Sequence, residues 1–430
     1  MRANEGLRVS ELVEESIAIW SKTTPELPDL GRRYSTREQQ EREQIADACL
    51  ERVDAIMREL RPRKVQAEDA QARITAAVVE LTSCALDLKD PYVDWLLADG
   101  FGGVSTGLAR QARRMDPRVS MIDILQAARN AWTTCGLQAL FGCTVQLTPS
   151  IFAYSMLYPY SDNYLDDASI GRQAKLAFSI RFRQRLAGEH ARPASEREEL
   201  IWALIEMIEA QYRRAEYPQV YESLLAIHEA QEQSISQLQA AKHADFDPLR
   251  LTFTKGGTSV LADGCLAAGH LSREQATFAF RWGIVLQLGD DLQDVSSDLQ
   301  RGSLTLYTQR AGREPLDQIT SRTLQFGRSV LAQIEGLESA NPILHELLRR
   351  SSKLLLIRSA AGAQELYTPQ YLAGLETYSP FRFDFLRQRE KELARRKREY
   401  GALFEDLIRF IPTETQFLEG TFRKENVLTR

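Results

Sequence analysis

The chain has few cysteines, no long apolar run and no excess of positive charge. Its five cysteines are scattered without the spacing of a metal site, which is typical of a protein in a reducing compartment. No run of about 18 apolar residues is present, so a membrane-spanning helix is not expected. The charged residues near the N-terminus do not fit a secretory signal. We therefore expect a cytoplasmic protein.

Alternation of apolar and polar residues, the pattern of a half-buried strand, is also missing. The apolar positions instead recur at helical spacing along the 430 residues, which predicts an all-α fold. The net charge of -5 gives no reason to expect nucleic acid as a partner. A chain of this length with 43% hydrophobic residues can bury a large core, as one domain or two.

Three segments are expected along the chain. Residues 1–34 hold one short amphipathic piece and a proline-bearing connector, and we interpret them as a loosely held leader. Residues 35–115 form an N-terminal helical extension packed on the main helical domain, residues 116–430. Side-chain caps predict where helices begin, at Ser35, Ser120, Thr148, Ser195 and Ser272. In the helix at 66–88, the apolar spacing predicts a buried face, made of Ile74, Val78, Leu81 and Leu86.

The segment at 281–305 has the spacing that most clearly implies chemistry. An apolar helix there ends in four carboxylates, Asp290, Asp291, Asp294 and Asp298. Residues four apart lie one above another on a helix, so three of them form a column and Asp291 is turned aside. Each like-charged pair destabilises an isolated helix by roughly 0.2–0.5 kcal/mol. Bound Mg2+ would account for the cluster, since it prefers oxygen ligands; the alternative is a solvated acidic helix end.

A second acidic cluster follows the aromatic-rich helix that Thr148 begins. Asp162 and Asp166 form another pair at a spacing of four residues. Tyr154 and Tyr158 lie on the same face, a lining that suits a large apolar ligand. Aromatics on a single helix are more often ordinary core, but two helices share this pattern of an apolar wall ending in carboxylates.

Three cations could bind an anion near these clusters. Arg172 follows the first cluster closely, and Arg301 follows the second. Lys255 precedes Gly256 and Gly257 inside an apolar helix. Two glycines there cost about 1 kcal/mol each relative to alanine, which indicates a helix break or a close backbone approach.

If the two clusters face each other, they would hold two or three Mg2+ ions at the mouth of one pocket. Trp282, Tyr154 and Tyr158 would line this pocket. The ions would stabilise a departing diphosphate, and the aromatic faces would favour a carbocation.

The two acidic motifs resemble those of the class I isoprenoid synthase superfamily. The sequence GIVLQLGDDLQDVSSDLQRG is similar to its second aspartate-rich motif, with Gln287 ahead of DDxxD. The segment DNYLD resembles the first motif, with Asn163 in place of the second aspartate, and PYSDNYLDD is similar to a pattern of bacterial terpene cyclases. Lys255 and Arg172 resemble the family's diphosphate-binding Lys and Arg. The resemblance covers roughly residues 145–310.

This resemblance implies a helical bundle around a central apolar cavity, here with extra N-terminal helices. It implies metal binding by the aspartates of both motifs, with catalysis centred on Asp162, Asp166, Asp290 and Asp294. Substrate binding would fall to the cations, the aromatics and Gln287. Chain-elongating members usually carry an N-terminal Gly-Gly-Lys segment, which is absent here, whereas cyclases usually carry an Asn/Asp, Ser/Thr, Glu triplet where this chain has Asp290, Asp294 and Asp298.

The leading hypothesis is therefore a Mg2+-dependent class I terpene synthase. It would ionise a linear prenyl diphosphate, then cyclise the carbocation or quench it with water. One alternative is a trans-isoprenyl diphosphate synthase that elongates chains with isopentenyl diphosphate. Another is an inactive helical partner subunit of such a synthase. The oligomeric state is left open, with a homodimer as one option.

Overall fold

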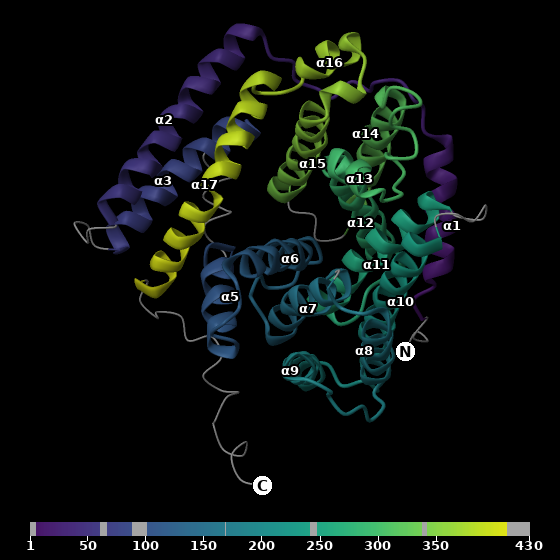
Figure 1. Ribbon diagram of the computed structural model, residues 1–430. Coiled ribbons are helices and arrows are strands. Elements are labelled where there is room, and N and C mark those ends of the chain that lie inside the picture. Colours follow the sequence, from purple (N-terminus) through teal and green to yellow (C-terminus); the bar gives the residue numbers. More distant parts are fainter. Residues whose placement is uncertain are drawn as a thin grey trace.

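Every regular element in the described part of the chain is a helix, as the apolar spacing predicts. The computed structural model describes residues 6–60, 67–87, 101–167, 169–240, 247–337 and 342–410 (Figure 1). The helices are α1 (Val9–Lys22), α2 (Thr36–Leu60), α3 (Ala67–Leu86), α5 (Phe101–Met115), α6 (Met121–Leu140), α7 (Pro149–Asp166), α8 (Arg172–Ala187), α9 (Glu196–Gln211), α10 (Pro218–Ala240), α11 (Pro248–Ala268), α12 (Arg273–Gln293), α13 (Val295–Arg301), α14 (Asp317–Leu331), η1 (Ala332–Gly336), α15 (Pro342–Gly362), η2 (Gln364–Leu366), α16 (Pro369–Glu376) and α17 (Phe383–Phe410).

The predicted helix starts are confirmed. Each depends only on a contact within one turn of helix, which the local sequence determines. The side chains of Ser120, Thr148 and Ser195 each accept a hydrogen bond from a backbone N–H of the first helical turn. Ser272 forms a full capping box with Gln275. Ser35 and Glu38 form the same reciprocal pair at the start of α2, at 2.8 and 3.3 Å.

The buried face predicted for the 66–88 helix is wrong in part. Val78 of α3 is 48% exposed, whereas Ala77 and Cys84 are buried. Cys84 belongs to a small apolar cluster with Ala46 of α2 and Phe381, which precedes α17. Leu81, one of the predicted residues, packs against this cluster, whereas Val78 is turned outward. The side chain of Leu86 lies outside the described residues.

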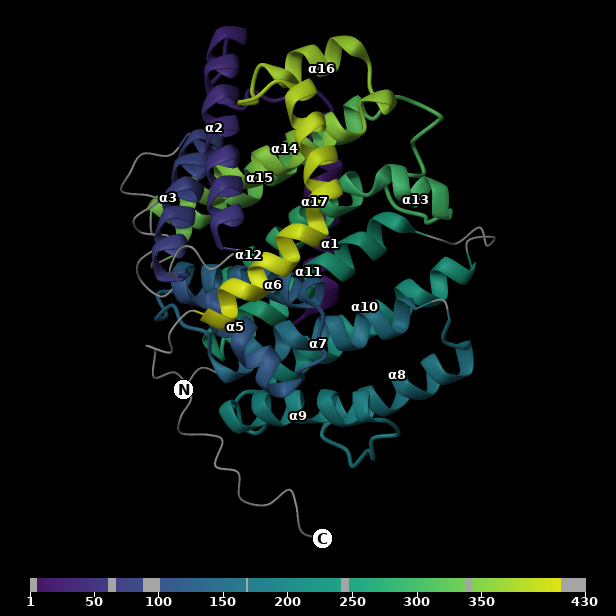
Figure 2. The same cartoon turned by 60° about the vertical axis from the view of Figure 1, so that its left-hand side comes forward.

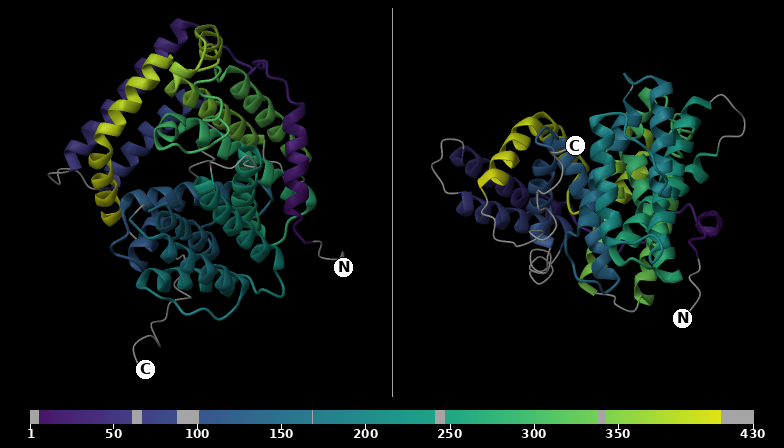
Figure 3. Two further views of the ribbon diagram at one scale, coloured as in Figure 1. Left: turned by 45° about the vertical axis from the view of Figure 1, so that its right-hand side comes forward. Right: turned by 90° about the horizontal axis from the view of Figure 1, so that it is seen from below.

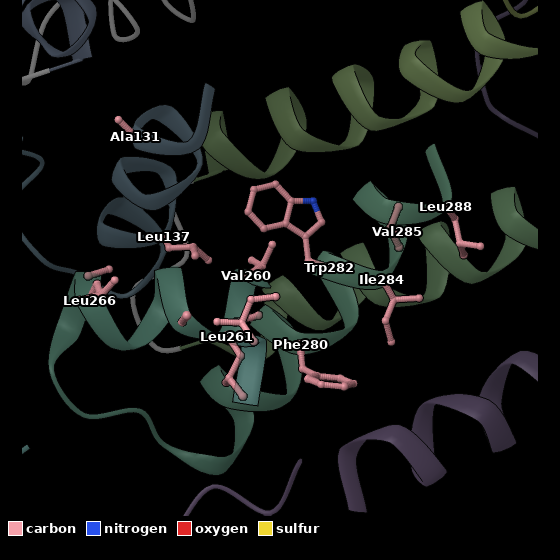
Figure 4. Packing of buried hydrophobic residues seen from close by; sticks show 14 of the residues in the cluster. Ala131, Leu137, Val260, Leu261, Leu266, Phe280, Trp282, Ile284, Val285 and Leu288 are labelled. Atoms are coloured by element: carbon pink, nitrogen blue, oxygen red, sulfur yellow. The ribbon is translucent and has the colours of Figure 1, made fainter. Parts of the chain in front are cut away.

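Helices α11 and α12 form the centre of the main bundle. Helix α11 packs against α6, α7 and α10, and α12 packs against α14 and α15. Figure 4 shows the interface, where Leu261 of α11 and Phe280 and Ile284 of α12 are fully buried. Helices α2 and α3 pack on each other beside this bundle (Figure 3), and α17 contacts α3 as well as α5, α6 and α15 of the bundle.

Helix α1, in the segment expected to be a loosely held leader, is packed on the bundle. It contacts α11, α12 and α14, and Trp20 is only 4% exposed. The Trp20 ring meets Phe253 and Phe326 edge-on, with ring centroids 5.7 Å apart in both pairs. The aromatic contacts tie α1 to two helices distant in sequence.

The glycines beside Lys255 serve a close helix crossing, and α11 continues through them without a break. A Cβ atom on Gly283 would lie 2.1 Å from the carbonyl oxygen of Gly256, and one on Gly256 would lie 2.4 Å from Cβ of Gln287. Neither position therefore accepts a side chain unless the two helices separate. Of the two options that the sequence left open, the close backbone approach is the one observed.

No helix in the described segments combines the length and apolar character that crossing a membrane requires.

The crossing predicts a large loss of stability for Gly283→Ala. The added methyl would push α11 away from α12, so the free energy of unfolding should fall by about 3 kcal/mol despite the better helix propensity of alanine. Gly136→Ala in α6 is the matched control, because a Cβ there meets nothing within 4 Å. It should leave stability unchanged or raise it by about 0.5–1 kcal/mol. Urea unfolding of both variants measures this, and equal stabilities would contradict it.

Candidate functional site

The carboxylates of the second motif keep helical spacing although α12 ends among them. Asp290 lies in the last turn of α12, and Asp294 lies at the junction with α13. The N–H of Asp294 donates to the carbonyl of Asp290, and the N–H of Asp298 donates to the carbonyl of Asp294, both at 2.9 Å. The backbone therefore holds the three aspartates in one row across the junction.

These three carboxylates also influence one another electrostatically. Burial, with the nearby charge of Asp294, raises the pKa of Asp290. Burial and the same charge raise the pKa of Asp298. Asp294 thus lies close enough to both neighbours for their charges to repel, as the predicted column requires.

Asp291 is turned away from this row, as expected, and faces α11. It is 8% exposed, and its two oxygens accept hydrogen bonds from Gln287 Nε2 at 2.8 Å and from Thr252 Oγ1 at 3.1 Å. Burial raises its pKa to about 6. The hydrogen bond from Thr252 joins Asp291 of α12 to α11, whereas the bond from Gln287 lies within α12. The parts of Asp291 and Gln287 in metal and substrate binding stay predictions.

Cations from three helices lie beside the carboxylate row. The charge of Lys255 on α11 lowers the pKa of both Asp290 and Asp298, opposing the effect of burial. Arg301, at the end of α13, acts on Asp298 in the same way. Arg129 of α6 has its Nη2 3.6 Å from Asp290 Oδ1. Sequence reasoning missed Arg129, because nothing within α6 indicates that it faces another helix.

The first motif lies at the C-terminal end of α7. Asp162 accepts hydrogen bonds from Ser161 Oγ at 3.1 Å and from Gln231 Nε2 of α10 at 2.8 Å. Asn163, the departure from the family motif, is exposed and donates to Asp123 Oδ1 of α6 at 2.9 Å. The side chains of Asp166 and Tyr158 lie outside the part of the chain that the structure describes.

Arg172, predicted to follow the first motif, is the first residue of α8 and is exposed. Because α8 begins shortly after α7 ends, Arg172 lies on the same side of the bundle as the end of α7. Figure 2 shows that α8, α10, α11 and α13 all extend to this side, at the right of the view.

Helix α6 contacts both acidic motifs. Its Asp123 binds Asn163 of the first motif, and its Arg129 lies beside Asp290 of the second. These two α6 residues are about 9 Å apart along the helix, at about 1.5 Å per residue. The ends of α7 and α12 therefore lie at the same end of the bundle.

Two of the aromatics predicted to line a pocket are within the bundle. The Tyr154 hydroxyl donates to the carbonyl of Ser259 at 3.3 Å. Trp282 is 4% exposed, and its ring stacks on Phe278 with centroids 6.0 Å apart. Figure 4 shows its indole projecting from α12 on the side opposite Phe280. Among the described residues, Trp282 Nε1 has no hydrogen-bond partner, so this buried donor is free to bind a ligand or water.

A buried polar network lies deeper between α6, α7 and α11. Asp263, 1% exposed, accepts hydrogen bonds from Thr134 Oγ1 at 2.6 Å and Asn130 Nδ2 at 3.0 Å. Ser155 of α7 in turn donates to Asn130 Oδ1 at 2.8 Å. Burial raises the pKa of Asp263 to about 7. The one sequence signal for this network was a lone aspartate within the apolar stretch VLADGCLAA.

The donor set suits Mg2+ in kind, since carboxylate oxygens that repel one another gain from a hard cation between them. Asp290 and Asp298 are half-buried, and Asp294 between them is exposed. Among the described side chains, which exclude Asp166, no three His, Cys, Asp or Glu residues are grouped closely enough to hold a metal. Metal binding by Asp162, Asp166, Asp290, Asp291, Asp294 and Asp298 therefore stays a prediction.

No family model, curated protein or solved structure matches this chain. The resemblance to class I isoprenoid synthases thus depends on the motif residues.

The Asp263 network predicts a specific dependence of stability on pH. A carboxyl whose folded pKa of about 7 exceeds its ordinary value of about 4 binds a proton more tightly in the folded state. Its contribution is complete below about pH 4 and is lost as pH rises through 7. Between pH 5 and 8, the wild type should therefore lose about 2–3 kcal/mol more stability than Asp263→Asn.

Urea unfolding at each pH gives this difference. Asp263→Asn should also be less stable than the wild type at pH 5 by about 1–3 kcal/mol, because the new amide N–H2 would face the donors of Asn130 and Thr134. Identical pH dependences would contradict the assignment.

Proposed function

We propose that the protein is a Mg2+-dependent class I terpene synthase that ionises a linear prenyl diphosphate. The observation that carries this proposal is the contact of one helix, α6, with both acidic motifs. Asp123 and Arg129 of α6 bind residues of the first and second motif. The carboxylate ends of α7 and α12 then belong to one site, as a shared diphosphate would require.

Carboxylates from both motifs would hold the metal, with Asp162 on one side and Asp290 and Asp294 on the other. Mg2+ supplies the positive charge that a leaving diphosphate needs when it is bound there. The proposal is supported by the raised pKa of Asp290, which reflects an acidic group that would gain from added positive charge.

Lys255, Arg129 and Arg301 would bind the diphosphate directly. Lys255 and Arg129 come from α11 and α6, so they approach the second motif from different helices. Their charges would orient the diphosphate at the acidic end of the bundle and stabilise it as the carbon–oxygen bond breaks.

The apolar part of the substrate would lie toward the interior of the bundle, below the carboxylates. Tyr154 and Trp282 would offer their ring faces to the carbocation and keep water from it. Trp282 is already buried, and its indole N–H has no hydrogen-bond partner within the described segments. The carbocation would end as a hydrocarbon by loss of a proton, or as an alcohol by addition of water.

Product analysis tests this proposal. Purified protein incubated with geranyl, farnesyl or geranylgeranyl diphosphate should release diphosphate and form a hydrocarbon or alcohol with Mg2+, but not with a chelator. Asp290→Asn should lower the turnover by about 100-fold or more, the loss typical of removing one group that stabilises developing charge. Glu189→Gln, at an exposed carboxylate after α8, is the control and should leave turnover unchanged.

Two other outcomes decide against the proposal. Product formed only after isopentenyl diphosphate is added would identify a chain-elongating enzyme instead. No product from any of these substrates, with or without isopentenyl diphosphate, would favour the inactive partner subunit.

A further inference from the structure

A cavity of about 380 Å³ lies away from the acidic motifs, between α12, α14, η1, α15 and the segment at 29–31. Val285 is the α12 residue in its wall. Successive helical residues turn by about 100°, so Val285 points to nearly the opposite side of α12 from Gly283, which faces α11. The cavity is therefore separate from the α11–α12 interface that carries Lys255.

The base of this cavity is mainly apolar, with Ser352 as its one buried polar residue among those described. Val285, Leu324 and Leu356 line it and are each at most 3% exposed. Gly327 of α14 keeps it open, since a Cβ atom there would already lie 3.4 Å from Cγ1 of Val285. A larger side chain at this position would fill the space.

The rim of the cavity carries cations from two helices. Arg328 of α14 has no ion-pair partner among the described residues, and Lys353 of α15 gives one hydrogen bond, to the carbonyl of Leu30 at 3.3 Å. An ammonium group has three donors, so Lys353 retains capacity for a ligand. Arg349 also lies at the rim. Its Nε and Nη2 donate to Glu346 at 2.6 and 2.7 Å, and its Nη1 lies near Gly31.

The acidic groups of the rim oppose these cations only in part. Asp29 Oδ1 already accepts from the N–H of Gly31 at 3.1 Å and from the Tyr378 hydroxyl at 3.4 Å. Glu335 is exposed.

Burial, followed by the charges of Arg349 and Arg350, lowers the pKa of Lys353 to about 8. A bound negative charge would relieve this repulsion.

We propose that this cavity binds a small anionic amphiphile. Its carboxylate or phosphate head lies between Arg328 and Lys353, and its apolar body lies against Val285, Leu324 and Leu356. The volume is at the small end of the range for small-molecule sites, which suits a short chain. A cation would be repelled at the rim, and a strongly polar molecule would lose its hydration against the base. This site is independent of the function proposed for the acidic motifs.

Calorimetric titration of the full chain in a chelator, without Mg2+, tests this site. The probes are octanoate and octyl phosphate, with octylamine and octanol as controls of the same chain length. Both anions should bind, octylamine should not, and octanol should bind more weakly than either anion. Whichever anion binds more tightly identifies the head group as a carboxylate or a phosphate monoester.

Variants locate the bound anion. Arg328→Gln and Lys353→Met should each weaken anion binding about tenfold, the effect of losing one charged hydrogen bond. Arg322→Gln, on α14 but outside the cavity lining, is the matched control and should bind as the wild type does. Gly327→Leu should abolish binding by filling the cavity, and circular dichroism should show that each variant is folded. Equal binding of octylamine and octanoate, or unchanged anion binding in the Arg328, Lys353 and Gly327 variants, would overturn the proposal.

Discussion

The contact between Gly256 and Gly283 sets the geometry on which the rest of the bundle depends. Because neither residue has a side chain, α11 and α12 come so close that a Cβ atom on Gly283 would overlap the carbonyl oxygen of Gly256. This closeness places Thr252 within hydrogen-bond distance of Asp291. It also brings the charge of Lys255 near Asp290. The glycines, costly in an isolated helix, thus position a cation beside a row of acids.

That row combines repulsion with partial burial. Asp290 and Asp298 have raised pKa values because water is partly excluded and Asp294 lies near both. Nearby cations offset this only in part: Arg129 is 3.6 Å from Asp290, at the outer limit of an ion pair. A row of carboxylates whose repulsion is offset only in part favours a further positive charge. This supports our proposal of a metal-bound diphosphate.

Features set within one turn of helix could be predicted from the sequence, whereas the partners that side chains find on other helices mostly could not. The caps at Thr148 and Ser272 and the spacing of Asp290 and Asp294 depend on local geometry alone, and these predictions are confirmed. Arg129 and Asp263 were missed because their partners come from other helices. Val78 was wrongly expected to be buried, since apolar spacing does not reveal which apolar positions of α3 face a neighbouring helix.

If Asp162 and Asp290 serve one site, their contributions to ligand binding should be coupled, and a double-mutant cycle measures that coupling. The binding of inorganic pyrophosphate in the presence of Mg2+ would be titrated with the wild type, Asp162→Asn, Asp290→Asn and the double variant. Each single change should weaken binding, and the double change should cost less than the sum of the two single changes, by about 1 kcal/mol or more. Strictly additive losses, or single changes without effect, would contradict it.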